Sequence, residues 1–460
     1  MTHAHPETLQ ALFGRGARCV AEEDFPGAVA SYDRALEIAP DLAEAHANLG
    51  VARERMGALA EAESCYRRAL ALDPDFLEGL LNLGALLIQQ KRFEEAAAIH
   101  AAAMRKHPEA PGLWSSLGVL HACLKEDEEA ERCLREALRL NPNHHRARYN
   151  LSYILLRQMR FIEGWEALEA RAWSLALNDQ IPAPRWQGED LAGKALLVGS
   201  EAGFGDMIHF VRYLPLLKQC GVARLGLVCP APLKRLFASL PGVDAVVALG
   251  EPVPDLGWDL WTLPMSAPHH CGTRMESIPA SIPYLRADPE QVRTWAERLP
   301  ASALKVGLAW KGNPRFENDA DRSLPGLETL APLASAGILF VSLQKGVAEA
   351  EAQDPPPGLA IFDPSSWIDD FADTGALMMN LDLVITVDTA AAHLAGALGR
   401  PCWVLLPHHK TDWRWFTGRD DSPWYPGLMR LFRQGPGGWE PVIREVAQAL
   451  QTVAKAKKES

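Results

Sequence analysis

The pattern of apolar and polar positions changes near Arg185 and Trp186. Before this point the pattern is helical, and after it short apolar runs alternate with helix-like stretches. A helical pattern followed by a strand and helix alternation predicts an all-α region and then an α/β region. The chain is therefore expected to hold two architectures in series.

The helical part is an array of repeats with a period of 34 residues. Small residues and prolines recur in one register: glycine at 16, 50, 84 and 118, alanine at 28, 62, 96 and 130 and again at 35, 69, 103 and 137, and proline at 40, 74, 108 and 142. Each unit is predicted to be two helices that cross at the small residues, with the proline ending the second helix. The pattern resembles the tetratricopeptide repeat, which Trp114, Gly118, Ala130, Ala137 and Pro142 fit best.

A fifth unit begins near Arg148 and has Ser152 and Gly164 where glycine and alanine are expected. It ends in the aromatic run FIEGWEALEARAW, so we predict a capping repeat that docks the array onto the following region. Stacked helix pairs curve into a superhelix with a concave groove, whose usual ligand is an extended peptide or another protein. A spacer or a dimerisation arm is the alternative.

Short apolar runs mark the strands of the α/β region. They begin at residues 195, 224, 243 and 259, with helix-like stretches at 206–218 and 231–239, and a second series begins at 305, 338, 359, 382 and 401 and closes with a helix at 440–457. A linker around Pro279, Ser281 and Pro283, continued by the charged stretch 287–300, separates the two series. This alternation predicts two doubly wound parallel sheets whose ligand crevices face each other, the two-domain plan called GT-B.

Composition narrows the possible partners. The 460 residues carry a formal net charge of -12, which argues against sequence-independent nucleic-acid binding, and no apolar run approaches the ~18 to 20 residues that span a bilayer. The start, MTHAHPETLQ, lacks the pattern of a secretory signal, and eight scattered cysteines fit reduced thiols. We therefore expect a cytoplasmic protein that neither spans a membrane nor binds nucleic acid.

Four short motifs carry a second resemblance. The segments SEAGFGDMI at 200–208, WKGNP at 310–314, NDADRS at 318–323 and DTAAAHLA at 388–395 resemble the heptosyltransferase-like glycosyltransferases. More closely, they resemble bacterial proteins in which such a domain follows tetratricopeptide repeats, and the resemblance covers nearly the whole chain. Ser200 and Ala202 depart from it, since relatives usually have glycine and glutamine there.

The first motif presents Asp206 at the start of a helix, after Gly203 and Gly205 have let the backbone turn sharply. A carboxylate there either caps the helix or accepts the proton of an acceptor hydroxyl during sugar transfer. The resemblance implies the second role, because Asp206 matches the base of the heptosyltransferases. Phe204 and the two glycines complete an acceptor-side loop with His209, which is a partner, an alternative base or a packing side chain.

The second half offers groups for a nucleotide. Lys311 follows a strand. Its ammonium either neutralises the negative charge of a leaving diphosphate or is a solvated charge in a loop. Asn313, in the same motif as Lys311, is a further predicted nucleotide-sugar-binding residue. Arg322 and Ser323 are weaker candidates for the same pocket. Gln344, followed by Lys345, ends a strand at an edge where a nucleobase or ribose could lie.

The stretch VITVDTAAAHLAGALG is the most specific of the motifs that predict nucleotide binding. A buried strand ends at Asp388 and Thr389 and a helix of small residues begins at Ala390, so free backbone N–H groups and the helix dipole face any anion there. A well-capped helix that binds nothing is the alternative. The resemblance implies that the diphosphate lies here, with Asp388 and His393 lining the site. The aromatic residues Trp413, Trp415, Trp424 and Tyr425 either stack on a sugar or base or belong to the core.

These features imply a metal-independent, inverting glycosyltransferase with a nucleotide-sugar as substrate and no cofactor. Its expected domains are the repeats with capping helices at 1–175, an acceptor-side Rossmann-like domain at 176–295 and a nucleotide-sugar-side Rossmann-like domain at 296–460. The repeats favour a protein acceptor, as in the O-linked N-acetylglucosamine transferases and the enzymes that modify flagellin, which have the same order of parts. A transferase for lipopolysaccharide or another glycan, and a non-catalytic adaptor with a vestigial nucleotide-binding domain, stay open as alternatives.

Overall fold

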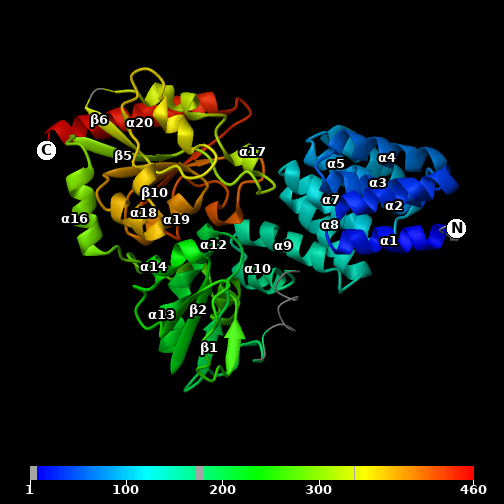
Figure 1. The fold of residues 1–460 in the computed structure, drawn as a ribbon, viewed down its shortest axis with the longest axis horizontal. Helices are drawn as coiled ribbons and strands as arrows, with labels where there is room; N and C mark the ends of the chain where they lie inside the picture. Colours follow the sequence, from blue (N-terminus) through cyan, green and yellow to red (C-terminus); the bar gives the residue numbers. More distant parts are fainter. Residues whose placement is uncertain (1–7, 172–180, 182, 336, 460) are drawn as a thin grey trace, which may run out of the picture. The chain divides into compact units, whose positions relative to one another are not determined.

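The computed structural model describes residues 8–171, 181, 183–335 and 337–459. The chain divides into two compact units, Met1–Ile154 and Leu155–Ser460. The first unit is helical and the second holds two parallel sheets with their helices (Figure 1). The predicted fold class, a repeat superhelix followed by an α/β region with two Rossmann-like domains, is confirmed. The predicted boundary after residue 175 lies outside the described residues.

The first unit consists of helix pairs in the predicted register. Its helices are α1 (Leu9–Ala21), α2 (Phe25–Ile38), α3 (Ala43–Arg55), α4 (Leu59–Leu72), α5 (Leu77–Gln89), α6 (Phe93–Lys106), α7 (Pro111–Cys123) and α8 (Asp127–Leu140). The helix α9 (His145–Arg157) runs across the division between the units, and α10 (Phe161–Leu168) belongs to the second.

The repeat glycines allow the two helices of a pair to touch. A Cβ on Gly50 would lie 2.5 Å from the ring of Tyr66, and one on Gly84 would lie 2.6 Å from Nε2 of His100. Gly16 with Tyr32 and Gly118 with Leu134 repeat this contact. The 34-residue glycine period therefore follows from close helix packing, because any side chain at these positions would overlap its partner helix.

Replacing Gly84 by alanine is expected to destabilise the helical unit by about 1–3 kcal/mol, because the added methyl group overlaps the buried His100. Gly14 on α1 is the matched control, since a Cβ there would meet only Arg18 Nη1 at 3.8 Å. Its replacement by alanine is expected to stabilise the unit by about 0.5–1 kcal/mol through helix propensity. Thermal unfolding followed by far-ultraviolet circular dichroism measures both, and equal effects of the two substitutions would contradict the packing argument.

The second unit is built on two wholly parallel sheets. The first sheet has the order β3-β2-β1-β4. Its strands are β1 (Ala195–Val198), β2 (Arg224–Cys229), β3 (Ala245–Ala248) and β4 (Leu260–Thr262). The second sheet has the order β10-β9-β8-β5-β6-β7. Its strands are β5 (Leu304–Ala309), β6 (Ile338–Ser342), β7 (Ile361–Phe362), β8 (Leu383–Val387), β9 (Cys402–Leu406) and β10 (Met429–Arg433).

Every strand expected from an apolar run forms, and the edge strand β10 is the one that the pattern does not reveal. Arginines at 430 and 433 interrupt its apolar residues, and the strand pairs only with β9. The linker prediction is wrong at 287–300, where the chain forms α16 (Pro289–Arg298). Asp288 caps this helix by accepting a hydrogen bond from Glu290 N, and Trp295 is buried beneath it. The predicted boundary between residues 295 and 296 falls inside this helix.

Helices cover both faces of the second sheet. The closing helix α20 (Trp439–Glu459) packs Val442, Ile443 and Val446 into the same core as Phe340 and Ile385 of the strands (Figure 1). The remaining helices are α12 (Phe204–Phe210), α13 (Leu214–Gln219), α14 (Lys234–Phe237), α15 (Ala267–His270), α17 (Asp319–Arg322), α18 (Phe371–Met378) and α19 (Ala390–Ala397). The two sheets are joined through these helices, since α12 packs on α19 and α14 on α18.

Strand order places the sequence motifs. The second sheet has the arrangement of dinucleotide-binding folds, in which the winding direction reverses between the first and fourth strands, here β5 and β8. The first sheet reverses between β1 and β4. Ligands of such sheets bind beyond the carboxyl ends of the strands at this reversal. The Asp206 loop follows β1, Lys311 follows β5, and Asp388 follows β8, so three motifs lie at the two reversals.

Candidate functional site

The acceptor-side loop and the predicted phosphate helix meet in the second unit. Helices α12 and α19 pack against each other, with Gly205 facing the start of α19. A Cβ on Gly205 would lie 3.1 Å from Cδ2 of His393 and 3.5 Å from the Cα of Ala390. The missing side chain is thus what lets the loop approach the helix this closely.

Asp206 has two roles in this arrangement. One carboxylate oxygen accepts a hydrogen bond from Gly203 N at 2.9 Å, which is the helix-capping contact. The other forms an ion pair with Arg414, whose guanidinium also binds both carboxylate oxygens of Asp412 at 3.0 Å. The side chain of Asp206 stays 26% exposed, whereas Arg414 is buried. Helix capping therefore does not exclude contact with a ligand, because part of the carboxylate surface stays exposed to solvent.

Strained backbone flanks this ion pair. Ala202 has φ of 56° and Phe416 has φ of 50°, in the left-handed region that residues with a Cβ rarely adopt. Such conformations cost about 1–3 kcal/mol each and cluster at ligand-binding sites. Ala202 precedes Asp206 in its loop, and Phe416 follows Arg414 in the other.

Some of the polar groups that follow β8 already form hydrogen bonds within the protein. Thr389 Oγ1 accepts a hydrogen bond from Ala391 N at 3.3 Å and so caps α19. Burial, and secondly the like charge of Asp412, raise the pKa of Asp388 from 3.8 to about 6. Arg322, the Trp415 indole and Arg414 act in the opposite direction. Asp388 therefore titrates closer to neutral pH than an ordinary aspartate does.

The raised pKa of Asp388 makes a prediction about stability. The folded protein binds this proton more tightly than the unfolded chain does, so the stabilisation is complete below about pH 4 and is lost as the pH rises through about 6. Asp388→Asn is therefore expected to raise the midpoint of thermal unfolding relative to the unsubstituted protein at pH 8, with the difference shrinking towards pH 5. A difference in the unfolding midpoint that does not depend on pH would contradict the raised pKa of Asp388.

Two histidines lie behind this surface and share one partner. Nδ1 of His209 lies 3.1 Å and Nδ1 of His393 lies 2.9 Å from the hydroxyl of Tyr425. Burial lowers the pKa of both imidazoles well below the ordinary value. His209 is fully buried, as the packing interpretation predicts, and its position does not suit an alternative base.

The four aromatic residues Trp413, Trp415, Trp424 and Tyr425 are buried to within 1% of their surface, which favours the core interpretation over stacking on a ligand. The ring of Trp415 stacks on His393 with a centroid distance of 5.3 Å. Trp413 and Trp424 also contact Trp165 of α10. The aromatic end of the last repeat thus packs into the core of the second unit.

The other predicted nucleotide groups hold the loop after β5. Lys311 Nζ forms an ion pair with Glu351 Oε1 at 2.7 Å. Gln344 is buried, and its Oε1 accepts hydrogen bonds from the backbone N–H groups of Trp310 and Lys311. Ser323 Oγ accepts a hydrogen bond from Gly312 N at 2.8 Å, and the side chain of Asn313 accepts one from Arg315 N at 3.0 Å.

The predicted residues therefore form two groups, one around the contact of α12 with α19 and one in the loop after β5 that carries Lys311. Asp206, Gly205, Asp388, Thr389, Ala390, His393 and His209 gather around the contact of α12 with α19. Arg322 binds Asp319 at 3.1 Å, and its charge lowers the pKa of Asp388, so it lies between this group and the Lys311 loop.

Sequence reasoning missed the residues that complete the site. Arg414 stands between two tryptophans in the aromatic loop, and an arginine within such an apolar run is a signal of a buried ion pair. Glu201 of the first motif is also buried, and its Oε1 accepts a hydrogen bond at 2.6 Å from Arg171, which follows α10. Glu201 therefore anchors the loop that carries Asp206.

Within residues 8–171, 181, 183–335 and 337–459, no three His, Cys, Asp or Glu side chains are placed to hold a metal ion. In this same part of the chain, every helix is too short or too polar to cross a bilayer.

The fold and the repeat register define the chain as a tetratricopeptide-repeat protein with an α/β region. The family model of the cilia and flagella-associated protein 70 middle TPR-like domain matches residues 17–131, and a tetratricopeptide repeat model matches residues 128–175. Among characterised proteins, Protein FlbA of Caulobacter vibrioides is 33% identical over 334 residues, which cover 65% of this chain and 54% of FlbA. The chain thus spans about half the length of this relative. Since the repeats end by residue 175, an alignment of this extent includes part of the α/β region.

Solved structures match part of the chain. A structure of Pseudomonas aeruginosa pilF is 27% identical, covering 36% of this chain and 75% of that chain with a TM-score of 0.33. A thermophilic TPR protein of Thermus thermophilus, TTC0263, is 23% identical, covering 38% of this chain and 96% of that chain with a TM-score of 0.34.

Proposed function

We propose that the protein is a glycosyltransferase that moves a sugar from a nucleotide-sugar to a hydroxyl group of a protein bound by the repeats. The observation that carries the proposal is the meeting of the Asp206 loop with the start of α19, at the carboxyl ends of two parallel sheets. Strained backbone on both sides of the Asp206–Arg414 pair supports a functional role for this place. Tetratricopeptide repeats, which the family models identify here, support binding of a protein.

In the proposed reaction, the acceptor oxygen attacks the anomeric carbon and its proton passes to a carboxylate oxygen of Asp206. The bond between the anomeric carbon and the phosphate oxygen breaks, and the nucleotide diphosphate leaves with the electron pair. The dipole of α19, the N–H group of Ala390 and the guanidinium of Arg322 stabilise the charge of the leaving group. Arg414 is a positioning residue, because it holds the carboxylate of Asp206 against the carboxyl ends of the second sheet.

A second candidate is a repeat adaptor whose α/β region binds no donor. It is favoured by the internal ion pairs of Lys311 with Glu351 and Asp206 with Arg414, which already occupy groups that the transferase needs. The acidic neighbours Asp388 and Asp412 also oppose an anion.

Calorimetry of the full chain with a panel of nucleotide-sugars and nucleoside diphosphates separates the two candidates. The transferase is expected to bind one donor class and to take up protons on binding between about pH 6 and 8, because a diphosphate beside Asp388 raises the pKa of this carboxyl further. Proton uptake is read from the dependence of the binding heat on the buffer. Absence of binding across the panel would contradict the transferase and support the adaptor.

A further inference from the structure

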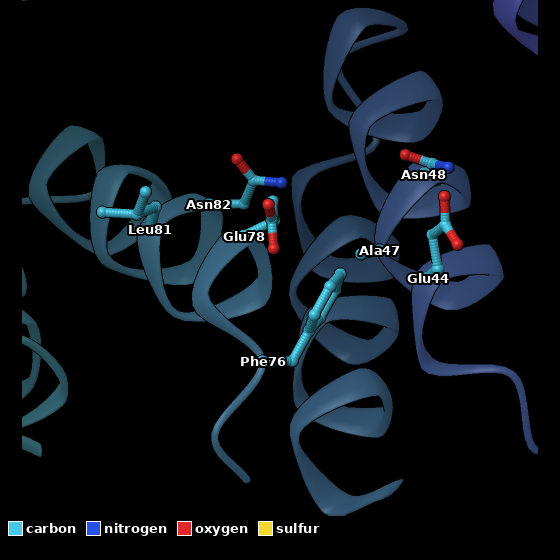
Figure 2. Close-up of a pocket in the computed structure, with 7 residues that line it drawn as sticks. All are labelled: Glu44, Ala47, Asn48, Phe76, Glu78, Leu81 and Asn82. Atoms are coloured by element: carbon cyan, nitrogen blue, oxygen red, sulfur yellow. The ribbon is translucent and has the colours of Figure 1, made fainter. Parts of the chain in front are cut away.

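The helical unit contains a pocket between α3 and α5 (Figure 2). Its volume is about 310 Å³, which is enough for one long side chain with its backbone. The lining residues are Glu44, Ala47, Asn48, Phe76, Glu78, Leu81 and Asn82. Two of these side chains are carboxylates and none is basic, so the pocket is acidic.

The two sides of the pocket are equivalent positions of consecutive repeats. Glu44 and Glu78 are separated by 34 residues, and so are Asn48 and Asn82. On each helix the glutamate lies one turn before the asparagine, on the same face. Figure 2 shows the amide of Asn82 and the carboxylate of Glu78 beside each other on α5, with Phe76 below Ala47. The pocket therefore offers a paired set of acceptors and an apolar base.

These polar groups are available to a partner. Glu44 and Glu78 are exposed and Asn48 and Asn82 are half-buried. Among the described residues, none forms an ion pair or a hydrogen bond with these four side chains. Some other glutamates of the unit are paired, such as Glu63, which binds Arg92 at 2.6 Å and Arg67 at 2.8 Å.

We propose that this pocket selects a lysine or arginine side chain of an extended protein segment. The carboxylates of Glu44 and Glu78 complement the cationic head group, while Phe76 and Ala47 cover its aliphatic stem. The inference rests on the protein-binding part of the proposed function and adds the chemistry of the partner. It does not depend on sugar transfer.

The spacing of the two helices suits an extended chain. Packed helices lie ~8–10 Å apart, and an extended peptide rises ~3.3 Å per residue, so about three residues of the segment pass from α3 to α5. The asparagine amides can donate to and accept from the peptide groups between them. The next repeat lacks this set, with Gly112 at the glutamate position and Ser116 bound to His100 at 2.8 Å. Selection is therefore local to the second and third repeats.

The test measures binding of short fluorescein-labelled Ser/Thr peptides to the full chain by fluorescence anisotropy, without any sugar donor. One peptide carries a single lysine, and the matched peptide carries norleucine at the same position, which keeps the aliphatic stem and removes the charge. The lysine peptide is expected to bind at least about tenfold more tightly. The double variant Glu44→Gln with Glu78→Gln is expected to remove this preference.

The matched control is Glu61→Gln with Glu94→Gln, which changes the net charge equally at exposed positions on α4 and α6. It is expected to keep the preference for lysine. Equal binding of the lysine and norleucine peptides, equal losses in the two double variants, or no binding of either peptide would overturn the proposal. Because no donor is present, a failure of the transferase proposal leaves this result unaffected, and the reverse also holds.

Discussion

Asp206→Asn is expected to slow sugar transfer by about 10²–10⁴-fold while leaving the affinity for the donor unchanged. Asparagine cannot accept a proton from the acceptor, but its side-chain oxygen can still accept the capping hydrogen bond from Gly203 N. Binding is measured by calorimetry and transfer by release of the nucleoside diphosphate.

Asp288→Asn is the matched control for this substitution. Asp288 also caps a helix of the second unit, accepting a hydrogen bond from Glu290 N at 2.8 Å. The control is expected to transfer sugar at the unsubstituted rate. A rate for Asp206→Asn equal to that of the unsubstituted protein would exclude Asp206 as the base, and equal slowing by both substitutions would reduce its effect to helix capping.

Glu201→Ala is expected to lower the free energy of unfolding of the second unit by about 1–3 kcal/mol, because Arg171 keeps its 3.0 Å ion pair with Glu169. The substitution leaves the guanidinium of Arg171, which is fully buried, without its 2.6 Å partner and removes the acceptor of Met265 N. Denaturation followed by tryptophan fluorescence reports on this unit, because Trp114 is the only one of the 14 tryptophans in the first unit.

An exposed ion pair of the same unit provides the comparison. Glu445 binds Arg430 at 3.1 Å with both side chains about half exposed, and Glu445→Ala is expected to cost about 0–1 kcal/mol. If Glu201→Ala cost no more than this, the buried pair would not anchor the loop. If it also lowered donor affinity in the folded protein, the position of Asp206 would depend on this anchor.

Local patterns predicted most of the fold. The 34-residue period reports contacts within each helix pair, as at Gly50 and Tyr66, and an apolar run reports a buried strand such as β8. The apolar pattern did not predict the edge strand β10, because arginines interrupt its apolar residues. The helix α16 was mistaken for a linker because its charged face outweighs its single fully buried residue, Trp295.

The candidate site was only partly predictable, because its electrostatics depend on contacts between distant segments. Asp206 and Asp388 could be placed at helix starts from their neighbours in sequence. The arginine that binds Asp206 comes from the loop after β9, and the glutamate that binds Lys311 follows β6. No local spacing relates such pairs. Lys311 therefore looked free in the sequence, although the structure pairs it with Glu351.

We propose that the contact of α12 with α19 is a nucleotide-sugar site. A crystal structure of the full chain with the nucleoside diphosphate that binds most tightly tests it most directly. We expect diphosphate oxygens within hydrogen-bond distance of the backbone N–H group of Ala390 at the start of α19, with Asp206 facing the position of the sugar. A nucleotide bound elsewhere, or a start of α19 still covered by the Gly205 loop at saturating nucleotide, would contradict it.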